Sequence, residues 1–108
     1  MSRRRVTTDV FSAIADPTRR GLLDQLSRGE QTVLGLARPF AVTLSAVSQH
    51  LKLLRAVGLV SVRRAGRERY YRLNPHPLHE VADWVGRYEH FWRGKLDALR
   101  DHLNENPT

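Results

Sequence analysis

The chain has 108 residues, which is the size of one ordinary domain and is too short for a multidomain enzyme. Its 18 Lys and Arg residues outnumber 11 Asp and Glu residues, and the formal net charge of +7 favours a polyanionic partner, either nucleic acid or an anionic membrane surface. The sequence contains no cysteine, which excludes disulfides and thiolate metal sites, and no apolar run reaches the length that spans a bilayer.

The first forty residues predict three short helices. A short apolar stripe ends at Asp16, and the next helix begins there, because Asp is a favoured N-cap and Pro17 fits the first helical position. Gly21 lies inside this second helix, where it costs about 1 kcal/mol relative to Ala, so we expect the backbone to pack closely there. Thr32 is the predicted cap of a third helix, which Pro39 should end.

A fourth helix is predicted from Thr43, its N-cap, to about Val57, with Gly58 ending it. At about 100° per residue, three leucines lie within roughly 60° of Val47 and should face the core; they are Leu44, Leu51 and Leu54. The opposite face carries short polar groups and a lysine; they are Ser45, Ser48, Gln49 and Lys52. This second face could contact a partner.

Two runs of alternating residues, 59–64 and 69–73, hold β-branched or aromatic side chains and are joined by a connection that contains a glycine. This pattern predicts a β-hairpin. Six arginines lie on or near it: Arg55, Arg63, Arg64, Arg67, Arg69 and Arg72. The hairpin should therefore be strongly basic.

Residues 77–104 predict one long helix, because apolar residues recur every three or four positions, close to a heptad spacing. The stripe consists of Val81, Trp84, Val85, Tyr88, Phe91, Trp92, Leu96, Leu99 and Leu103. A small domain cannot easily bury so long a stripe, so a partner helix in a symmetric homodimer is the favoured interpretation. The alternative is that the helix folds back on its own domain.

The charge is distributed unevenly along the chain. Residues 1–78 carry 14 Lys and Arg against 5 acids, whereas residues 79–108 carry 4 against 6. The basic partner surface should therefore belong to the first three-quarters of the chain. Arg3 to Arg5 either form an arm that reaches DNA or are an unstructured end.

The order of helices, basic hairpin and final helix predicts a mainly α fold with a β-hairpin wing, that is, a winged helix-turn-helix with a long C-terminal dimerisation helix. Its most specific motifs are ADPTRR at 15–20, LARPF at 36–40, LSAVSQHLKLLRAVGLV at 44–60, Gly66-Arg67, YRL at 71–73 and YEHFWRGKLDAL at 88–99. In these motifs the chain resembles the ArsR/SmtB family of bacterial winged-helix transcriptional repressors. The resemblance covers nearly the whole chain and implies a single domain over 1–108. In it, 6–76 form the DNA-binding core and wing, and 77–104 form the dimerisation helix.

The resemblance implies that the partner is double-stranded DNA with an inverted-repeat operator, bound by a homodimer that acts as a repressor. A recognition helix needs small or amide side chains that reach base edges in the major groove. The candidate base-reading residues are Ser45, Ser48, Gln49 and His50. The candidate backbone and wing contacts are Thr43, Lys52, Arg55, Arg64, Arg67 and Arg69.

Two other functions remain as alternatives. Metal-sensing relatives use cysteines in the third helix or Asp and His on the last helix, but residues 32–36 hold no soft ligand, and His79 and Asp83 do not match a bridging site. We therefore expect no metal and no cofactor, with a sensor that uses His, Asp or Glu ligands as the alternative. An RNA-binding module usually exposes aromatic platforms, which this pattern does not predict.

No enzyme motif is present, and we expect a soluble cytoplasmic protein without a membrane partner.

Overall fold

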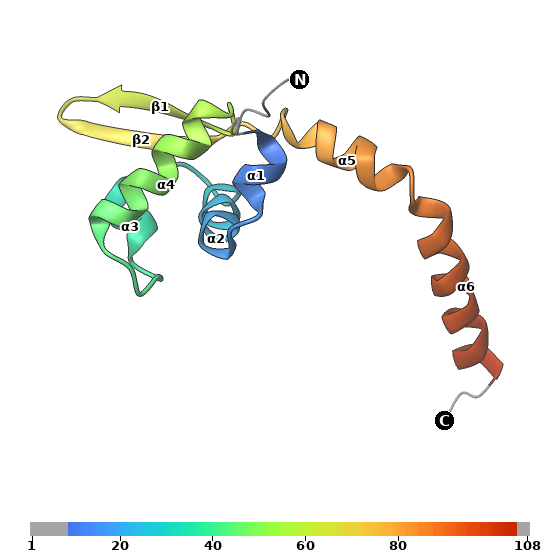
Figure 1. Ribbon diagram of the computed structural model, residues 1–108. Coiled ribbons are helices and arrows are strands. Elements are labelled where there is room, and N and C mark those ends of the chain that lie inside the picture. Colours follow the sequence, from blue (N-terminus) through green and yellow to red (C-terminus); the bar gives the residue numbers. More distant parts are fainter. Residues whose placement is uncertain (1–8, 106–108) are drawn as a thin grey trace, which may run out of the picture. The chain divides into compact units, whose positions relative to one another are not determined.

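A computed structural model describes residues 9–105, so Arg3 to Arg5 of the predicted arm lie outside the described residues. The elements, shown in Figure 1, are α1 (Val10–Ile14), α2 (Pro17–Leu26), α3 (Val33–Ala37), α4 (Leu44–Ala56), β1 (Val60–Ala65), β2 (Glu68–Leu73), α5 (Leu78–Gly86) and α6 (Glu89–Glu105). The chain divides after Leu78 into two units, residues 1–78 and residues 79–108. The predicted mainly α fold with a hairpin wing and a long C-terminal helix is confirmed.

Side-chain caps start each of the first four helices. Asp16 accepts a hydrogen bond from the backbone N–H of Arg19 at 2.9 Å, with Pro17 at the first helical position. Thr32 and Thr43 cap α3 and α4 in the same way, through bonds of 3.2 and 3.0 Å. These caps satisfy N–H groups that have no partner within the helix, so the local sequence determines where each helix begins.

The core of the first unit lies between α2, α3, α4 and the base of the hairpin. Its fully buried large side chains are Leu22, Leu36, Val47, Leu51, Leu54 and Leu59. Leu44 differs from the prediction: it is 47% exposed, because it is the first residue of α4 and precedes the turn that meets the core. The close approach predicted at Gly21 is made by a side chain and not by the backbone. A Cβ built there would lie 2.6 Å from Cε1 of Phe40.

The hairpin pairs β1 with β2 from Val60 opposite Leu73 to Ala65 opposite Glu68. Gly66, the first residue of the two-residue turn, has φ of 64°, as a type II′ turn requires. Near the middle of β2, Gln31 extends the sheet, because its N–H donates to the carbonyl of Tyr71 and its carbonyl accepts from the N–H of Tyr71, at 3.1 and 2.8 Å. The hairpin is thereby attached to the segment between α2 and α3.

The single helix predicted over 77–104 is wrong in one respect, because the chain forms α5 and α6 with a break at Arg87 and Tyr88. The N–H groups of both residues bond to carbonyls three positions back, Trp84 and Val85, at 3.2 and 2.9 Å. Gly86 is the last residue of α5, and glycine is a poor helix former. Across the break, the ring centroids of Trp84 and Tyr88 are 5.5 Å apart in an edge-on arrangement.

Candidate nucleic-acid interface

One face of α4 is polar and exposed while the other is fixed in the core. The buried side chains of Val47, Leu51 and Leu54 orient the helix. The exposed face, which we call the recognition face, consists of Ser45, Ser48, Gln49 and Lys52. The structure thus brings together three of the four predicted base-reading residues with one predicted backbone contact. Arg55 is also exposed, near the C-terminal end of the helix.

His50 is set apart from the recognition face. It is half-buried, and its Nδ1 lies 3.3 Å from Nη1 of Arg19 in α2. Arg19 also donates from Nε to the carbonyl of Ala13 at 2.7 Å and from Nη2 to the carbonyl of Ser12 at 3.0 Å. The guanidinium therefore connects the end of α1 to the recognition helix.

Sequence reasoning did not identify Arg19 as a functional residue, although a signal was present. Arg19 and Arg20 lie at the N-terminal end of α2, where a positive charge is unfavourable against the helix dipole. The structure shows that both side chains turn back to carbonyl groups at the C-terminal end of α1, with Arg20 bonding to Ile14 at 2.8 Å. A cation is favourable at that end of a helix.

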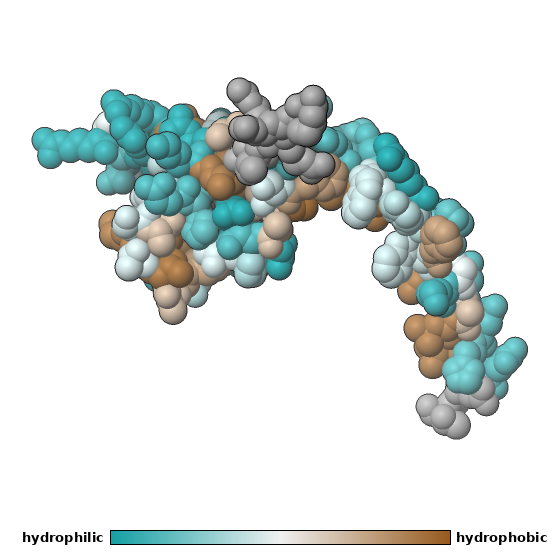
Figure 2. Space-filling view, viewed as in Figure 1, coloured by the Kyte–Doolittle hydropathy of each residue, from teal (hydrophilic) through white to brown (hydrophobic). Residues whose placement is uncertain are grey.

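The predicted wing contacts lie at the tip of the hairpin, where Figure 2 shows hydrophilic side chains. Arg64 and Arg69 are direct cross-strand partners, and Arg67 lies in the turn between the strands. Like charges directly opposite each other destabilise a strand pair. A pair of arginines at this position therefore weakens the free hairpin and favours a negatively charged partner at its tip.

Arg63 has a different environment from the other hairpin arginines. Its Nη2 and Nε donate to both carboxylate oxygens of Glu30, at 2.8 and 3.1 Å, and its guanidinium lies 5.0 Å from the ring centre of Tyr70. The hydrogen bond from Arg63 lowers the pKa of Glu30, and the same bond raises the pKa of Arg63. Arg63 thus connects the middle of the hairpin to Glu30.

An open hollow of about 460 Å³ lies beside the recognition face. Its lining residues are Arg19, Gln49, His50, Lys52, Leu53 and Ala56, and we call it the α2–α4 hollow. Asp16, the N-cap that precedes α2, lies close enough to interact with Arg19 and His50 of this hollow. The backbone N–H of Arg19 and then the charge of that side chain hold the pKa of Asp16 below its usual value, while desolvation opposes this shift.

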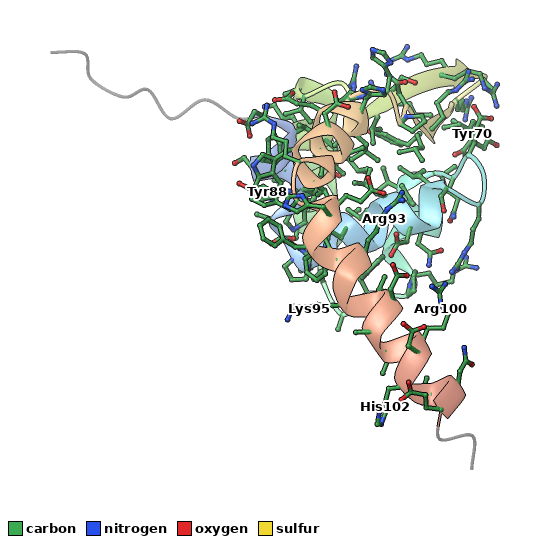
Figure 3. All side chains as sticks on the ribbon, turned by 90° about the vertical axis from the view of Figure 1, so that its right-hand side faces the viewer. Tyr70, Tyr88, Arg93, Lys95, Arg100 and His102 are labelled. Carbon is green, nitrogen blue, oxygen red and sulfur yellow. The ribbon has the colours of Figure 1, made fainter. Side chains whose placement is uncertain are left out.

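The second unit exposes most of the predicted apolar stripe. Eight of its nine residues are 44% to 63% exposed, and Val81 is half-exposed. Figure 2 shows hydrophobic side chains along one side of α6. In Figure 3, Arg93 and Arg100 project from the same side of α6, where they form ion pairs with Glu89 and Asp97 at 2.7 and 3.0 Å. The helix is therefore amphipathic, with its apolar side accessible.

Around the helix break, the apolar stripe forms an open hollow of about 340 Å³. Trp84, Val85, Tyr88, Phe91 and Trp92 line this apolar hollow. Large exposed apolar patches on a single chain mark surfaces that another molecule covers.

Residues 9–105 hold neither a candidate metal centre nor a candidate membrane-spanning helix. This range contains no group of three or more His, Cys, Asp or Glu side chains placed to hold a metal ion. His79 and Asp83, weighed above as ligands, form an exposed pair with Nδ1 and Oδ2 3.2 Å apart. Within the same range, no helix is both long enough and apolar enough to cross a membrane.

The chain is similar to known transcriptional regulators. The Helix-turn-helix domain family matches residues 14–63. The HTH-type transcriptional regulator Rv2034 of Mycobacterium tuberculosis is 44% identical over 96 residues, which cover 89% of this chain and 87% of that protein. The transcriptional repressor SmtB homolog of Synechocystis sp. is 46% identical over 79 residues, which cover 69% of this chain and 60% of that protein.

Among solved structures, the chain is similar to the homodimeric winged helix-turn-helix DNA-binding domain Mb0332 from Mycobacterium bovis, described as a possible ArsR-family transcriptional regulator. The TM-score is 0.61 at 31% sequence identity, and the match covers 74% of this chain and 77% of that chain. The hairpin, the capped helix before it and these similarities agree with the motifs in the sequence. The chain belongs to the ArsR/SmtB family of winged helix-turn-helix transcriptional regulators.

Proposed function

We propose that the chain is a homodimeric repressor that binds an inverted-repeat DNA operator. In each half-site, Ser45, Ser48 and Gln49 contact base edges in the major groove. The phosphate backbone is contacted by Thr43, Lys52, Arg55, Arg64, Arg67 and Arg69. The single observation that carries this proposal is the recognition face of α4, which is exposed and polar while the opposite face is held in the core.

The chemistry of the recognition face fits base reading. A glutamine amide can pair with the two major-groove groups of adenine, and a serine hydroxyl can donate or accept. A buried apolar face behind these residues fixes their direction, since Val47 and Leu54 are completely buried. Lysine and arginine at the edges of the helix and on the wing supply contacts to phosphate, which position the protein without specifying a sequence.

The apolar stripe supports a homodimer. Its exposed residues in α5 and α6 would be covered by the same face of a second copy, because a two-fold dimer pairs identical surfaces. Two recognition helices related by such an axis address half-sites about one helical turn apart in a pseudo-palindrome. Repression follows from occupancy of a promoter, and one relative is named as a transcriptional repressor.

Gln49→Ala tests base reading against backbone attraction. We expect it to cost on the order of 1–3 kcal/mol per half-site on an operator selected from a random duplex pool, because a bidentate base contact is lost. Binding to random duplex should hardly change, since that attraction comes from phosphates.

Arg67→Ala is the matched variant, because it lies in the wing turn away from α4. It should weaken operator and random DNA alike and flatten the slope of log affinity against log salt by about one per half-site. Salt titrations of both variants on both DNAs provide the measurement. Equal losses on the two DNAs for Gln49→Ala would contradict the assignment, and preference for RNA in a competition experiment would contradict the partner.

A further inference from the structure

We infer that the α2–α4 hollow binds one backbone phosphate of each DNA half-site, held by Arg19, His50 and Lys52. This inference rests on the proposed DNA-binding function and adds α2 to the contacts proposed for α4 and the wing. The observations that carry it are the open hollow, the three basic side chains that line it and the fixed position of Arg19.

Arg19 is held in place before any ligand arrives. Three of its N–H groups are directed to the carbonyls of Ala13 and Ser12 and to Nδ1 of His50, at 2.7, 3.0 and 3.3 Å. A guanidinium has five N–H groups, so two remain after these three bonds. A cation that is already ordered loses little side-chain entropy when it binds phosphate, in contrast to a free arginine on a surface.

The contact with Arg19 also determines which atom of His50 carries the proton. A guanidinium can only donate, so Nδ1 of His50 must accept, and the neutral ring then carries its proton on Nε2. His50 is therefore a hydrogen-bond donor through Nε2 while uncharged. A phosphate oxygen has acceptor sites alone, which this donor can satisfy.

Lys52 and Gln49 connect the hollow to the recognition face, because both residues belong to each of them. A phosphate in the hollow would thus lie next to the base that Gln49 contacts. Leu53 and Ala56 complete the lining with apolar surface. Asp16 is the opposing charge, but its carboxylate is occupied as the cap of α2.

Arg19→Ala and Arg20→Ala form a matched pair of variants. Each removes one positive charge and at least one bond to a carbonyl of α1, but Arg19 lines the hollow and Arg20 is not among its lining residues. On random duplex, Arg19→Ala should lower affinity about tenfold per half-site and flatten the salt slope by about one, whereas Arg20→Ala should change the slope by less than half as much. Equal changes would overturn the inference.

A second experiment locates the phosphate. Each phosphate of the selected operator is replaced in turn by a neutral methylphosphonate, and wild type and Arg19→Ala are titrated on every duplex. Wild type should lose about tenfold at one position per half-site, and Arg19→Ala should lose nothing further at that position. If both proteins are equally sensitive at all positions, the phosphate is not held by Arg19.

Arg19→Ala also removes the side-chain bonds that stabilise the end of α1. A third variant therefore leaves the Arg19 side chain and its bonds to α1 intact. Asp16→Asn keeps a good N-cap and removes the negative charge near the hollow, so random DNA should bind a few-fold tighter. Asp24→Asn, an exposed charge further along α2, is the control. Equal effects of the two changes would count against the hollow. Failure of wild type to bind duplex DNA at all would overturn the proposed function. If Gln49→Ala and Arg67→Ala behave as expected but Arg19→Ala binds DNA no differently from Arg20→Ala, this inference alone is overturned.

Discussion

The two units of the chain differ in where their apolar side chains lie. In residues 9–78, leucines and valines from α2, α3, α4 and β1 are buried against one another. In residues 79–105, no residue is buried, and both tryptophans are about half-exposed or more, at 48% and 60%. The first unit therefore has an internal core, whereas the second depends on association for burial of its apolar face.

The stabilities of the two units should therefore respond differently to protein concentration. Folding of the first unit is governed by contacts within one chain, and its stability should not depend on concentration. For the proposed homodimer, burial in the second unit is governed by mass action, because a partner that binds the folded state adds stability that grows with the logarithm of its concentration.

The largest effect is expected from Trp92→Glu, which places a charge in the apolar stripe. A carboxylate buried at an interface without a partner costs several kcal/mol, so the dimer dissociation constant should rise at least about a hundredfold. Sedimentation across a concentration series measures this constant. Asp101→Arg is the control, because it lies on the opposite side of α6 and should leave the dimer intact.

The same variant tests the independence of the two units. The tertiary structure of residues 9–78 should survive in the monomer, because α1 to α4 and the hairpin have their own core. Collapse of that core together with the dimer would show that the two units fold as one, and a monomeric wild type at micromolar concentration would refute the homodimer.

A smaller effect is expected at Gly21, a partly buried residue of α2 in the first unit. Gly21→Ala adds a methyl group 2.6 Å from the ring of Phe40 and should lower the free energy of unfolding by about 1–2 kcal/mol despite the better helix propensity of alanine. In a Phe40→Ala background the clash is absent, so the same change should raise stability by up to about 1 kcal/mol. Urea unfolding of the four proteins measures this reversal, and the same sign in both backgrounds would rule out the contact.

The smallest effect concerns the cap of α2. Asp16→Ala should cost about 1 kcal/mol at neutral pH, as loss of an N-cap does. The pKa of Asp16 is lowered by the N–H of Arg19, so the charged cap stabilises the fold above the ordinary value of 3.8. The difference from wild type should shrink as pH falls through the lowered pKa. Thr32→Ala removes an uncharged cap and should have an effect independent of pH, which unfolding curves at several pH values would test.

The elements of the first unit could be predicted because their determinants are local. Asp16, Thr32 and Thr43 mark helix starts within a few residues of the N–H groups that they cap. The alternating pattern of the hairpin and Gly66 determine its register and turn. By contrast, the break after Gly86 was missed, because apolar residues continue at a spacing of three or four across it.

Prediction of the interface was limited by contacts between distant residues. A helical wheel places His50 at the edge of the polar face but cannot reveal Arg19, which is 31 positions earlier. In the same way, composition counts Arg63 with the other hairpin arginines, whereas Glu30 binds it from 33 positions away. Recognition-face residues were predictable because they share one helix, and their exposure follows from periodicity alone.

The attachment of the hairpin to Glu30 and Gln31 has a thermodynamic consequence. Two main-chain bonds between Gln31 and Tyr71 and two bonds from Arg63 to Glu30 hold the middle of the wing to the segment that leads into α3. The spacing between wing and recognition helix is then set during folding, and its conformational entropy is lost before DNA is met. DNA binding therefore needs little further ordering of the wing outside its turn. DNA whose groove does not match the fixed spacing between wing and recognition helix must be deformed to bind, and it should therefore bind more weakly.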